Sequence, residues 1–390
     1  MRAPGLATLP LLIACCGSTE TPPGARHLPP PELIGYWDLQ RRGTNFMNQV
    51  ESADRFAAAA AVNIRLVRLA PDKWRAHERD FLLGNADDSR GVDENDFAKL
   101  REVLDTANAS GVRVVLTMLS LPGLRWVQNN GGAQDARLYT DPRFVDEACN
   151  FWIELADKLR GHPAIVGYNL LNEPDPERIP EARDVAIHSL YQRLVECVRR
   201  VDPDTPIVLD GPSYASPFAT DRFQPVSDSR TLYAFHLYEP WPYVDHRQRG
   251  TIAYPGQIPS EDDPATTEYW DRNALARVLD RVVAWQQAHG VPSNRIFLGE
   301  FGCPRTHPGV QTWLGDVIAL ANERGWHWAF YAFREDTWAA MDYELGPSPL
   351  PASYWNLPEE SQQRELAARR GDNAIWRALL QHFVSGSAQR

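Results

Sequence analysis

The sequence contains little cysteine and none of the common metal-binding motifs. Only five cysteines occur in 390 residues: two lie near the N-terminus, and the others are Cys149, Cys197 and Cys303. An odd number of widely spaced cysteines predicts no disulfide framework, and the helical patterns around Cys149 and Cys197 indicate small buried apolar side chains. Neither H-E-x-x-H nor a paired C-x-x-C occurs, and Ala86 stands where the acidic loop at residues 87–91 would need its first calcium ligand. We therefore expect no metal site and no other cofactor.

Runs of lysine or arginine are also missing. Lysine and arginine number 40 against 51 aspartates and glutamates, which gives a net charge of −11. Because nucleic acids attract basic surfaces, this balance argues against a nucleic-acid partner. The 13 tryptophans are a high number. Most of them are expected in the core, but flat aromatic rings also suit the C–H faces of sugars.

The first 31 residues are expected to lie outside the folded domain. Residues 1–16 have the pattern of a signal peptide, with an apolar stretch, Gly5–Ala14, that is too short to span a bilayer. It ends in Leu12-Ile13-Ala14-Cys15, which resembles the lipobox of bacterial lipoproteins, and the Pro-rich residues 17–31 predict a tether. We expect an exported protein that meets the membrane only through lipid on Cys15. Secretion after cleavage of an ordinary leader is the alternative.

Strand-like and helix-like runs alternate from residue 32 to residue 386. Eight candidate strands are present: Leu33–Trp37, Ile64–Leu69, Arg113–Leu119, Ala164–Leu171, Ile207–Asp210, Leu232–Tyr238, Ile296–Phe301 and His327–Phe333. Eight strands alternating with helices over about 350 residues predict a single α/β domain, a (β/α)8 or TIM barrel. A doubly wound sheet is the rival, but no G-x-G-x-x-G follows any strand. Neither an internal repeat nor a linker indicates a second domain.

The helices between these strands show start and stop signals. The clearest are Asp96–Ser110, Asp141–Gly161, Pro180–Val201, Asn273–His289 and Val310–Arg324. Asp372–Phe383 is expected to be the closing helix. The Pro-rich stretch Gly346–Leu357 is expected to form a long loop over one face of the barrel.

The stretch Tyr168–Pro174 begins as a strand and ends in polar groups. The apolar run from Ala164 to Leu171 predicts a strand buried on both faces, and Pro174 forbids further pairing. Because an unpaired charge is costly to bury, Glu173 is expected at a cleft, where a raised pKa would let it donate a proton. A lone glutamate in such a place is more often a helix cap.

Polar side chains also mark the carboxyl ends of other predicted strands, which is where barrels of this type carry their catalytic groups. Arg68 lies on the second strand, and His236 and Tyr238 lie on the sixth. Glu300 interrupts the apolar strand I-F-L-G-E-F, and only a closed barrel would bring it to Glu173. Paired carboxylates about 5–5.5 Å apart define retaining glycoside hydrolysis, with one residue as acid/base and the other as nucleophile.

Three short motifs together resemble glycoside hydrolase family 5, the cellulase family, over nearly all of residues 33–383. They are Leu171-Asn172-Glu173-Pro174, His236-Leu237-Tyr238 and Gly299-Glu300-Phe301-Gly302. The resemblance implies that Glu173 is the acid/base and Glu300 the nucleophile. It also implies that Asn172 bonds the sugar 2-hydroxyl, and that Tyr238 holds the nucleophile with His236 beside the site.

The same resemblance implies further substrate contacts and contains two departures. The additional residues expected at the substrate are Arg68, which would steady the nucleophile, Trp241, Tyr331 and Trp338. Leu119 stands where the family usually has a histidine, so one hydrogen bond to the substrate is missing or supplied from elsewhere. The aromatic residue under the cleaved sugar is expected to be Tyr331, with Phe330 and Phe333 as competitors.

These expectations describe a monomeric retaining endo-β-glycosidase that hydrolyses β-1,4-linked glucan, as polysaccharide or oligosaccharide. A β-mannanase or another β-glycanase of the same family is the alternative within this class. A barrel that binds polysaccharide without cleaving it is the alternative from another class, and the two intact glutamates argue against it.

Replacement of Cys15 tests the predicted anchor. Without the thiol no lipid can be attached, so Cys15→Ser should yield a soluble or uncleaved product in cell fractionation, whereas the wild-type protein should partition with membranes. Mass spectrometry of the mature N-terminus provides the second measurement. A wild-type protein that is released with an unmodified N-terminus would exclude the lipid anchor.

Overall fold

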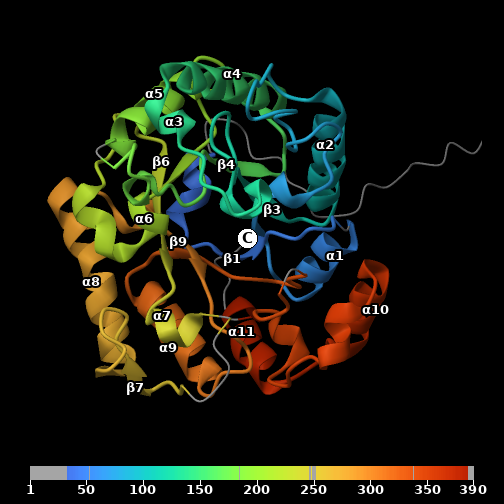
Figure 1. Ribbon diagram of the computed structural model, residues 1–390, viewed down its shortest axis with the longest axis vertical. Coiled ribbons are helices and arrows are strands. Elements are labelled where there is room, and N and C mark those ends of the chain that lie inside the picture. The colour runs from blue at the N-terminus through green and yellow to red at the C-terminus, as the bar shows by residue number, and fades with distance from the viewer. Residues whose placement is uncertain are drawn as a thin grey trace, which may run out of the picture.

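Eight parallel strands close into a barrel that a ring of helices surrounds (Figure 1). The computed structural model describes residues 33–51, 53–183, 185–245, 247, 252–336 and 338–384. The predicted signal peptide and tether lie outside these residues. The strands follow the order β1-β10-β9-β6-β5-β4-β3-β2 around the barrel, and every neighbouring pair is parallel. The predicted TIM barrel is therefore confirmed.

The barrel strands are short, and their carboxyl ends all meet at one mouth because they are parallel. Their bounds are β1 Arg42–Phe46, β2 Leu66–Leu69, β3 Arg113–Thr117, β4 Ile165–Asn169, β5 Ile207–Asp210, β6 Thr231–Leu237, β9 Ile296–Phe301 and β10 His327–Phe330. Seven of the eight overlap a predicted strand.

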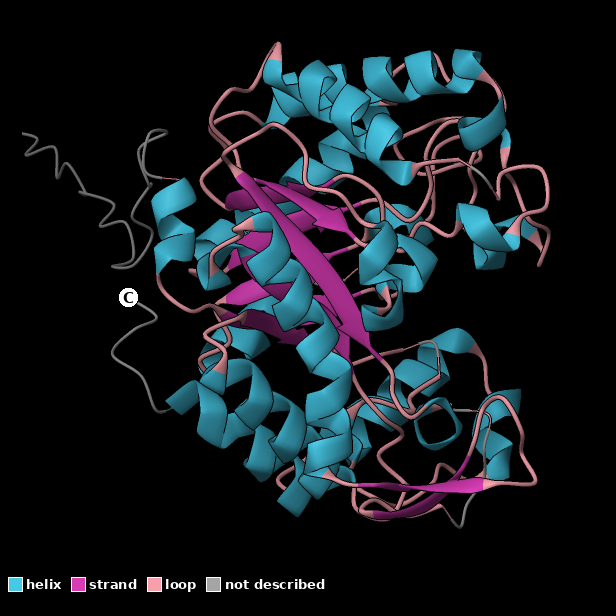
Figure 2. Ribbon diagram, turned by 90° about the vertical axis from the view of Figure 1, so that its left-hand side faces the viewer, coloured by secondary structure: helices cyan, strands magenta, loops and turns pink. Residues whose placement is uncertain are grey.

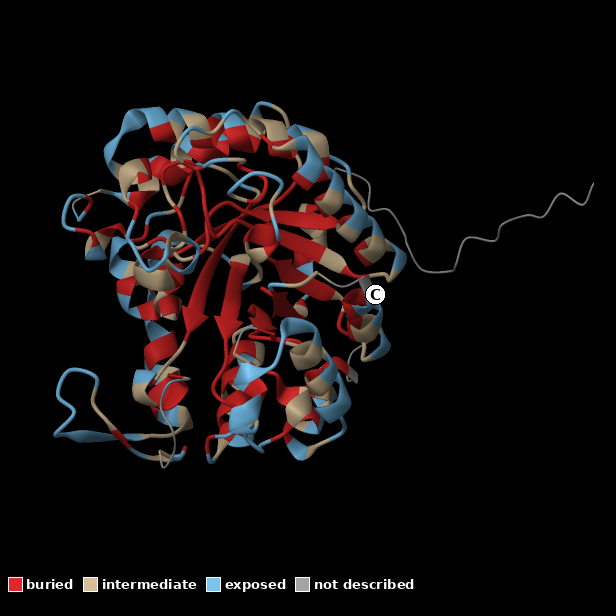
Figure 3. Cartoon of the chain, turned by 45° about the vertical axis from the view of Figure 1, so that its right-hand side comes forward, coloured by how far each residue is buried: buried red, intermediate tan, exposed pale blue. Residues whose placement is uncertain are grey.

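The helices pack their apolar faces on the strands and leave their outer faces exposed (Figure 3). The longer ones are α1 Ala53–Ala61, α2 Glu94–Ala109, α4 Pro142–Leu159, α5 Ile187–Arg199, α8 Arg272–His289, α9 Val310–Glu323, α10 Glu359–Arg369 and α11 Ala374–Val384, and the short ones are α3 Arg137–Thr140, α6 Pro212–Ala215 and α7 Trp241–Val244. Aspartates cap several helix starts: Asp93 accepts backbone N–H groups at the start of α2, and Asp271 does so at α8. Gly290, at φ 64°, ends α8 in the left-handed conformation that glycine adopts easily.

The first predicted strand was wrong. Leu33–Trp37 is not a strand, because Ile34–Asp38 forms a 3-10 helix and β1 begins at Arg42. Trp37 is fully buried, and its Nε1 donates to the Val166 carbonyl, 2.9 Å away. The apolar residues of this segment therefore close the amino end of the barrel instead of pairing as a strand.

Trp37 packs on an apolar layer inside the amino end of the barrel. The other members of this lower apolar layer are Leu66, Val115, Val166, Val208, Leu232, Ala234, Phe297 and Ala329. The true first strand, R-G-T-N-F, has few apolar residues, because its polar residues belong to the layer above, at the other end of the barrel. Its sequence therefore carried no clear strand signal.

The expectation that Cys149 and Cys197 are unpaired was also wrong. The two residues form a disulfide between α4 and α5, with their Cα atoms 5.5 Å apart. Both are buried, as predicted, but the pairing depends on how two helices pack side by side, which the spacing of the cysteines does not reveal. Cys303 is a free, buried thiol.

Several of the observed elements were not anticipated. An antiparallel hairpin, β7 Gly256–Pro259 with β8 Thr267–Trp270, projects from the barrel between β6 and α8 (Figure 2). The expected loop at residues 346–357 contains a 3-10 helix, Ala352–Asn356, and α10 follows it.

Among the described helices, none has the length and apolar character needed to cross a bilayer.

Candidate active site

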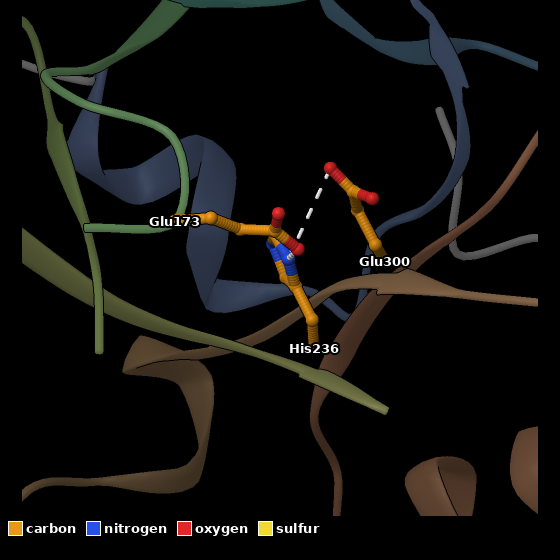
Figure 4. Close-up of side chains that lie close together, drawn as sticks. All are labelled: Glu173, His236 and Glu300. Atoms are coloured by element: carbon orange, nitrogen blue, oxygen red, sulfur yellow. Dashed lines mark hydrogen bonds and ion pairs between the residues drawn. The ribbon is translucent and has the colours of Figure 1, made fainter. Parts of the chain in front are cut away.

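The polar residues predicted at the strand ends converge on one cavity at the mouth of the barrel. The cavity has a volume of about 670 Å³ and is lined by both glutamates. Glu173 follows β4, His236 lies on β6 and Glu300 lies on β9, and their side chains point toward one another (Figure 4). One carboxylate oxygen of each glutamate and a ring nitrogen of His236 lie within 4.8 Å of one another.

Glu173 is held in an unusual backbone conformation. Its φ is 48°, in the left-handed region that non-glycine residues rarely adopt, and its backbone N–H donates to Asp210 Oδ2 over 3.1 Å. Its Oε1 lies 2.6 Å from His236 Nδ1. Burial, reinforced by the negative charge of Asp210, raises the pKa of Glu173 to about 8. At neutral pH this carboxyl is therefore protonated.

Glu300 has a different set of neighbours. It is buried within β9, where Arg68 Nη1 lies 2.5 Å from its Oε1 and the Tyr238 hydroxyl donates to Oε2 over 2.8 Å. Burial raises the pKa of Glu300 and the nearby Glu173 adds to this, while His236, Arg68 and the Tyr238 hydrogen bond lower it. Glu300 accepts hydrogen bonds from a guanidinium and a phenol, whereas Glu173 has the weaker side-chain hydrogen bond of Asn172, so the first proton that the pair takes up goes to Glu173.

Arg68 lies behind the cavity and links several polar residues of the site through hydrogen bonds. Its guanidinium is fully buried and donates to Asn169 Oδ1 and Asn172 Oδ1, each at 2.8 Å, and to Asp210 Oδ2 at 2.9 Å, as well as to Glu300. Burial by itself would lower the pKa of Arg68, but the surrounding carboxylates, Asp210 first, raise it overall. The charge is therefore permanent.

His236 lies beside Glu300 in the β6–β9 pairing. A side chain at residue 299 would collide with it, because a Cβ added to Gly299 would lie 3.0 Å from His236 Nε2. Burial lowers the pKa of His236 despite the nearby acids. The ring is therefore neutral near pH 7 and carries a single N–H, on one of its two nitrogens.

The aromatic residues predicted at the substrate surround these groups. Trp241 is 39% exposed and lines the cavity, as do Tyr331 and Trp338, whose rings stack with their centroids 6.1 Å apart. Of the three candidates at and after the end of β10, only Tyr331 reaches the cavity. Phe330 packs against Tyr343, Trp376 and Phe383, whereas Phe333 packs against Phe46 and Trp376.

Leu119, which stands where the resemblance implies a histidine, also lines the cavity and makes that part of its wall apolar. All the predicted site residues within the described part of the chain thus lie at or directly behind one cavity. Cys15, the predicted lipidation site, lies outside that part.

Sequence reasoning missed Asp210 and three residues that contact Arg68. Asp210 ends β5 and is fully buried. The rule that selected Glu173, a polar residue at the carboxyl end of an apolar strand, would have selected it too. Asn45, Asn169 and Thr117 also contact Arg68. Asn45 was hidden because the first strand was misplaced.

Glu173, His236 and Glu300 are also the one group in the described part of the chain whose atoms lie close enough to hold a metal ion. Both oxygens of Glu300 already accept hydrogen bonds, and the permanent charge of Arg68 at 2.5 Å would repel a cation. We therefore assign no metal to this group.

The raised pKa of Glu173 predicts a pH-dependent cost in stability. Between pH 4.5 and about 8 the folded protein keeps a proton that the unfolded chain has released, so the free energy of unfolding falls as pH rises through this window. Glu173→Gln removes the titration and should be more stable than wild type by about 2–4 kcal/mol at pH 8, with a smaller gain at pH 5. Thermal unfolding at several pH values measures this difference. Glu268→Gln on the exposed strand β8 is the control, and parallel curves for wild type and Glu173→Gln would contradict the assigned pKa.

Comparison with known proteins shows which family and which fold the chain matches. The model of the family described as cellulase (glycosyl hydrolase family 5) matches residues 36–337. A β-xylosidase from Phanerodontia chrysosporium is 23% identical over 340 residues, which cover 83% of this chain and 65% of that protein. Endoglucanase C from Acetivibrio thermocellus is 22% identical over 188 residues, which cover 46% of this chain and 52% of that protein. The matches thus span about half to two thirds of the length of these relatives.

Among solved structures, the endoglucanase Cel5A of Thermotoga maritima has the same fold. It matches 87% of this chain and 100% of its own with a TM-score of 0.59, at 17% sequence identity. At that identity the likeness shows the barrel alone, whereas the family model extends from the 3-10 helix below the barrel to the residues after β10. The chain therefore belongs to glycosyl hydrolase family 5.

Proposed function

We propose that the protein is a retaining endo-β-glycosidase that hydrolyses β-1,4-linked glucan by double displacement. The observation that carries this proposal is the pair of glutamates, whose nearest oxygens lie within 4.8 Å and whose surroundings differ. This separation is shorter than the roughly 6.5–9.5 Å between the carboxyls of inverting enzymes, which favours retention of configuration over inversion. One of them, Glu173, holds a proton at neutral pH, as a general acid must.

In the first step of the proposed reaction, an oxygen of Glu300 attacks the anomeric carbon while Glu173 gives its proton to the departing glycosidic oxygen. The C–O bond to the leaving group breaks, and a glycosyl ester on Glu300 forms. Arg68 and Tyr238 are positioned to hold Glu300 through its two oxygens, 2.5 and 2.8 Å away. They also favour the charged form of this carboxylate over the protonated form.

In the second step, Glu173 is ionised and takes a proton from a water molecule that attacks the same anomeric carbon. The ester bond breaks, Glu300 regains its charge, and Glu173 regains its proton. Asn172 lies next to Glu173, and its Oδ1 accepts a hydrogen bond from Arg68. Its amide nitrogen, which bonds Glu173 here, we assign to the sugar 2-hydroxyl when substrate is bound.

The choice of glucan rests on the aromatic lining of the cavity and on the similarity to endoglucanases. Trp241, Tyr331 and Trp338 present rings on which sugar faces can stack. The similarity to a β-xylosidase, which covers more of this chain than the match to endoglucanase C, favours other β-glycosides as the second candidate. Turnover on a panel of glucans, mannans, xylans and short oligosaccharides separates these substrates and distinguishes endo from exo action.

Export, attachment through Cys15 and a monomeric state belong to the same proposal. A substrate that is a long polysaccharide has to be met outside the cytoplasm, and a tethered enzyme would meet it at the cell surface. Membrane fractionation of the Cys15→Ser protein addresses the attachment, and light scattering of the soluble domain addresses the monomer.

Variants of the two glutamates test their separate roles. Glu300→Ala should lose turnover on every substrate while retaining oligosaccharide binding in calorimetry, because the nucleophile is absent but the cavity remains. Glu173→Ala should lose roughly 100- to 10,000-fold in rate on a natural glycan. With a dinitrophenyl glycoside, whose leaving group needs no proton, the rate of the first step in Glu173→Ala should fall much less.

The burst of dinitrophenol measures that first step directly, before the slower hydrolysis of the glycosyl ester. Equal losses of Glu173→Ala on the two substrates would remove Glu173 from the acid role. Oligosaccharide binding without turnover by the wild-type protein on any member of the panel would favour the non-catalytic barrel.

Tyr238→Phe tests the bond that holds the proposed nucleophile. The hydroxyl stabilises charged Glu300, so its removal raises the pKa of Glu300 and should move the acidic limb of the pH–rate profile to higher pH. Turnover should fall by roughly 10- to 1000-fold, with thermal stability little changed. Tyr243→Phe is the control, because that buried hydroxyl donates to the Pro308 carbonyl instead. An active Tyr238→Phe enzyme with an unshifted limb would make Tyr238 part of the cavity wall only.

A further inference from the structure

Asp210 lies directly behind the reacting groups without lining the cavity. Its side chain is fully buried at the end of β5. Oδ2 accepts from Arg68 over 2.9 Å and from the Glu173 backbone N–H over 3.1 Å, and Oδ1 accepts from Asn169 over 3.0 Å. The guanidinium of Arg68 compensates the negative charge of Asp210, and that charge acts on Glu173.

The imidazole of His236 lies between two carboxyl groups. Nδ1 is 2.6 Å from Glu173 Oε1, and Nε2 is 3.5 Å from Asp210 Oδ2. In the described part of the chain Nε2 forms no hydrogen bond, so Asp210 is the charged acceptor that it faces. A neutral imidazole carries one N–H, and the contact made by one nitrogen decides the role of the other.

The two tautomers place the proton of Glu173 differently. With the N–H on Nε2, the hydrogen faces the Asp210 carboxylate, and the bare Nδ1 can only accept, so Glu173 has to donate and must be protonated. With the N–H on Nδ1, the lone pair of Nε2 faces the negative charge of Asp210, and Glu173 becomes the acceptor. The charge of Asp210 therefore favours the first arrangement.

We infer that Asp210 is a positioning residue that selects the Nε2–H tautomer of His236 and so keeps the acid proton on Glu173 before each turnover. The inference rests on the proposed function, because it assigns a use to the proton that Glu173 would donate. It also gives His236 a role, because the tautomer of its ring transmits the effect of the Asp210 charge to Glu173.

Other charged and titratable groups lie near His236 and Glu173. Some of them favour the protonated form of Glu173, and others favour its ionised form. They are Arg68 on β2, Asp175 after β4, Tyr214 on α6, Tyr238 after β6 and Glu300 on β9. Arg68 favours ionised Glu173, whereas Asp175 and Glu300 favour the protonated form. Burial and the charge of Asp210 are the two largest causes of the raised pKa of Glu173, in agreement with the geometry.

Asp210→Asn is the variant that removes the charge, with its NH2 group in place of the oxygen that accepts from Asn169. Asparagine has the same shape and retains an oxygen that can accept the Glu173 backbone N–H, so the left-handed turn at Glu173 keeps its support. Asp202→Asn is the matched control, because Asp202 is equally buried but bonds Tyr168 and Thr205 at the amino end of β5.

Kinetics provide the first measurement. With a substrate whose leaving group needs protonation, Asp210→Asn should move the basic limb of the kcat/KM profile down by about 1–2 pH units. At pH 7 it should lower kcat more than it changes KM, and the dinitrophenyl burst should be much less affected. A basic limb that stays in place in Asp210→Asn, or that shifts equally in Asp202→Asn, would overturn the inference.

Nitrogen-15 NMR of the imidazoles tests the tautomer without activity. The His236 signals are assigned by their loss in His236→Asn, and below the basic limb the wild-type protein should show a proton on Nε2 and a bare Nδ1. A proton on Nδ1 in the wild type would overturn the inference even if Asp210→Asn did not fold. A wild-type protein that hydrolyses no glycoside would instead overturn the proposed function, which distinguishes the two failures.

Discussion

The buried guanidinium of Arg68 is the constraint on which the mouth of the barrel depends. Moving charges out of water is expensive, and a buried ion pair is stable only when its remaining donors and acceptors are satisfied. Arg68 meets this condition because Glu300, Asp210, Asn169 and Asn172 approach it from three different strands or their ends. Removing one partner from such a set leaves an unpaired buried charge, a loss of about 3–5 kcal/mol. The positions of these strands are therefore coupled through one side chain.

The same arrangement gives Glu173 and Glu300, which have identical side chains, different tendencies to hold a proton. Glu300 receives the donors, and Glu173 receives a neutral imidazole and the charge of Asp210 behind its backbone. Arg68 and Tyr238 thus favour the charged form of Glu300, whereas the surroundings of Glu173 favour its protonated form, which is the division that the proposed retaining hydrolysis needs. The cost appears in the folded state, where Glu173 occupies a left-handed conformation and a site that disfavours its charge.

The inside of the barrel consists of two layers with opposite character. Trp37 and the lower apolar layer fill the amino end, where side chains of eight strands would otherwise enclose empty space. The polar layer that contains Arg68, Asp210, His236 and Glu300 lies above it and opens to the cavity. The lower layer excludes water from beneath the charges, and this raises the strength of every electrostatic interaction in the site.

Local chemistry in the sequence was sufficient for the barrel and for the location of the site. Eight apolar runs alternating with helices admit few closed folds, and a charge inside an apolar strand must lie at its open end, which placed Arg68, Glu173 and Glu300 together. The identity of β1, the Cys149–Cys197 pair and the position of Asp210 against His236 were decided only by the tertiary structure. Each depends on which elements become neighbours across the barrel or between helices, and hydrophobic spacing along one segment carries no information about the partner that the segment will meet. The different protonation of the two glutamates was likewise decided by the tertiary structure, because the pKa of each is set by side chains from other strands.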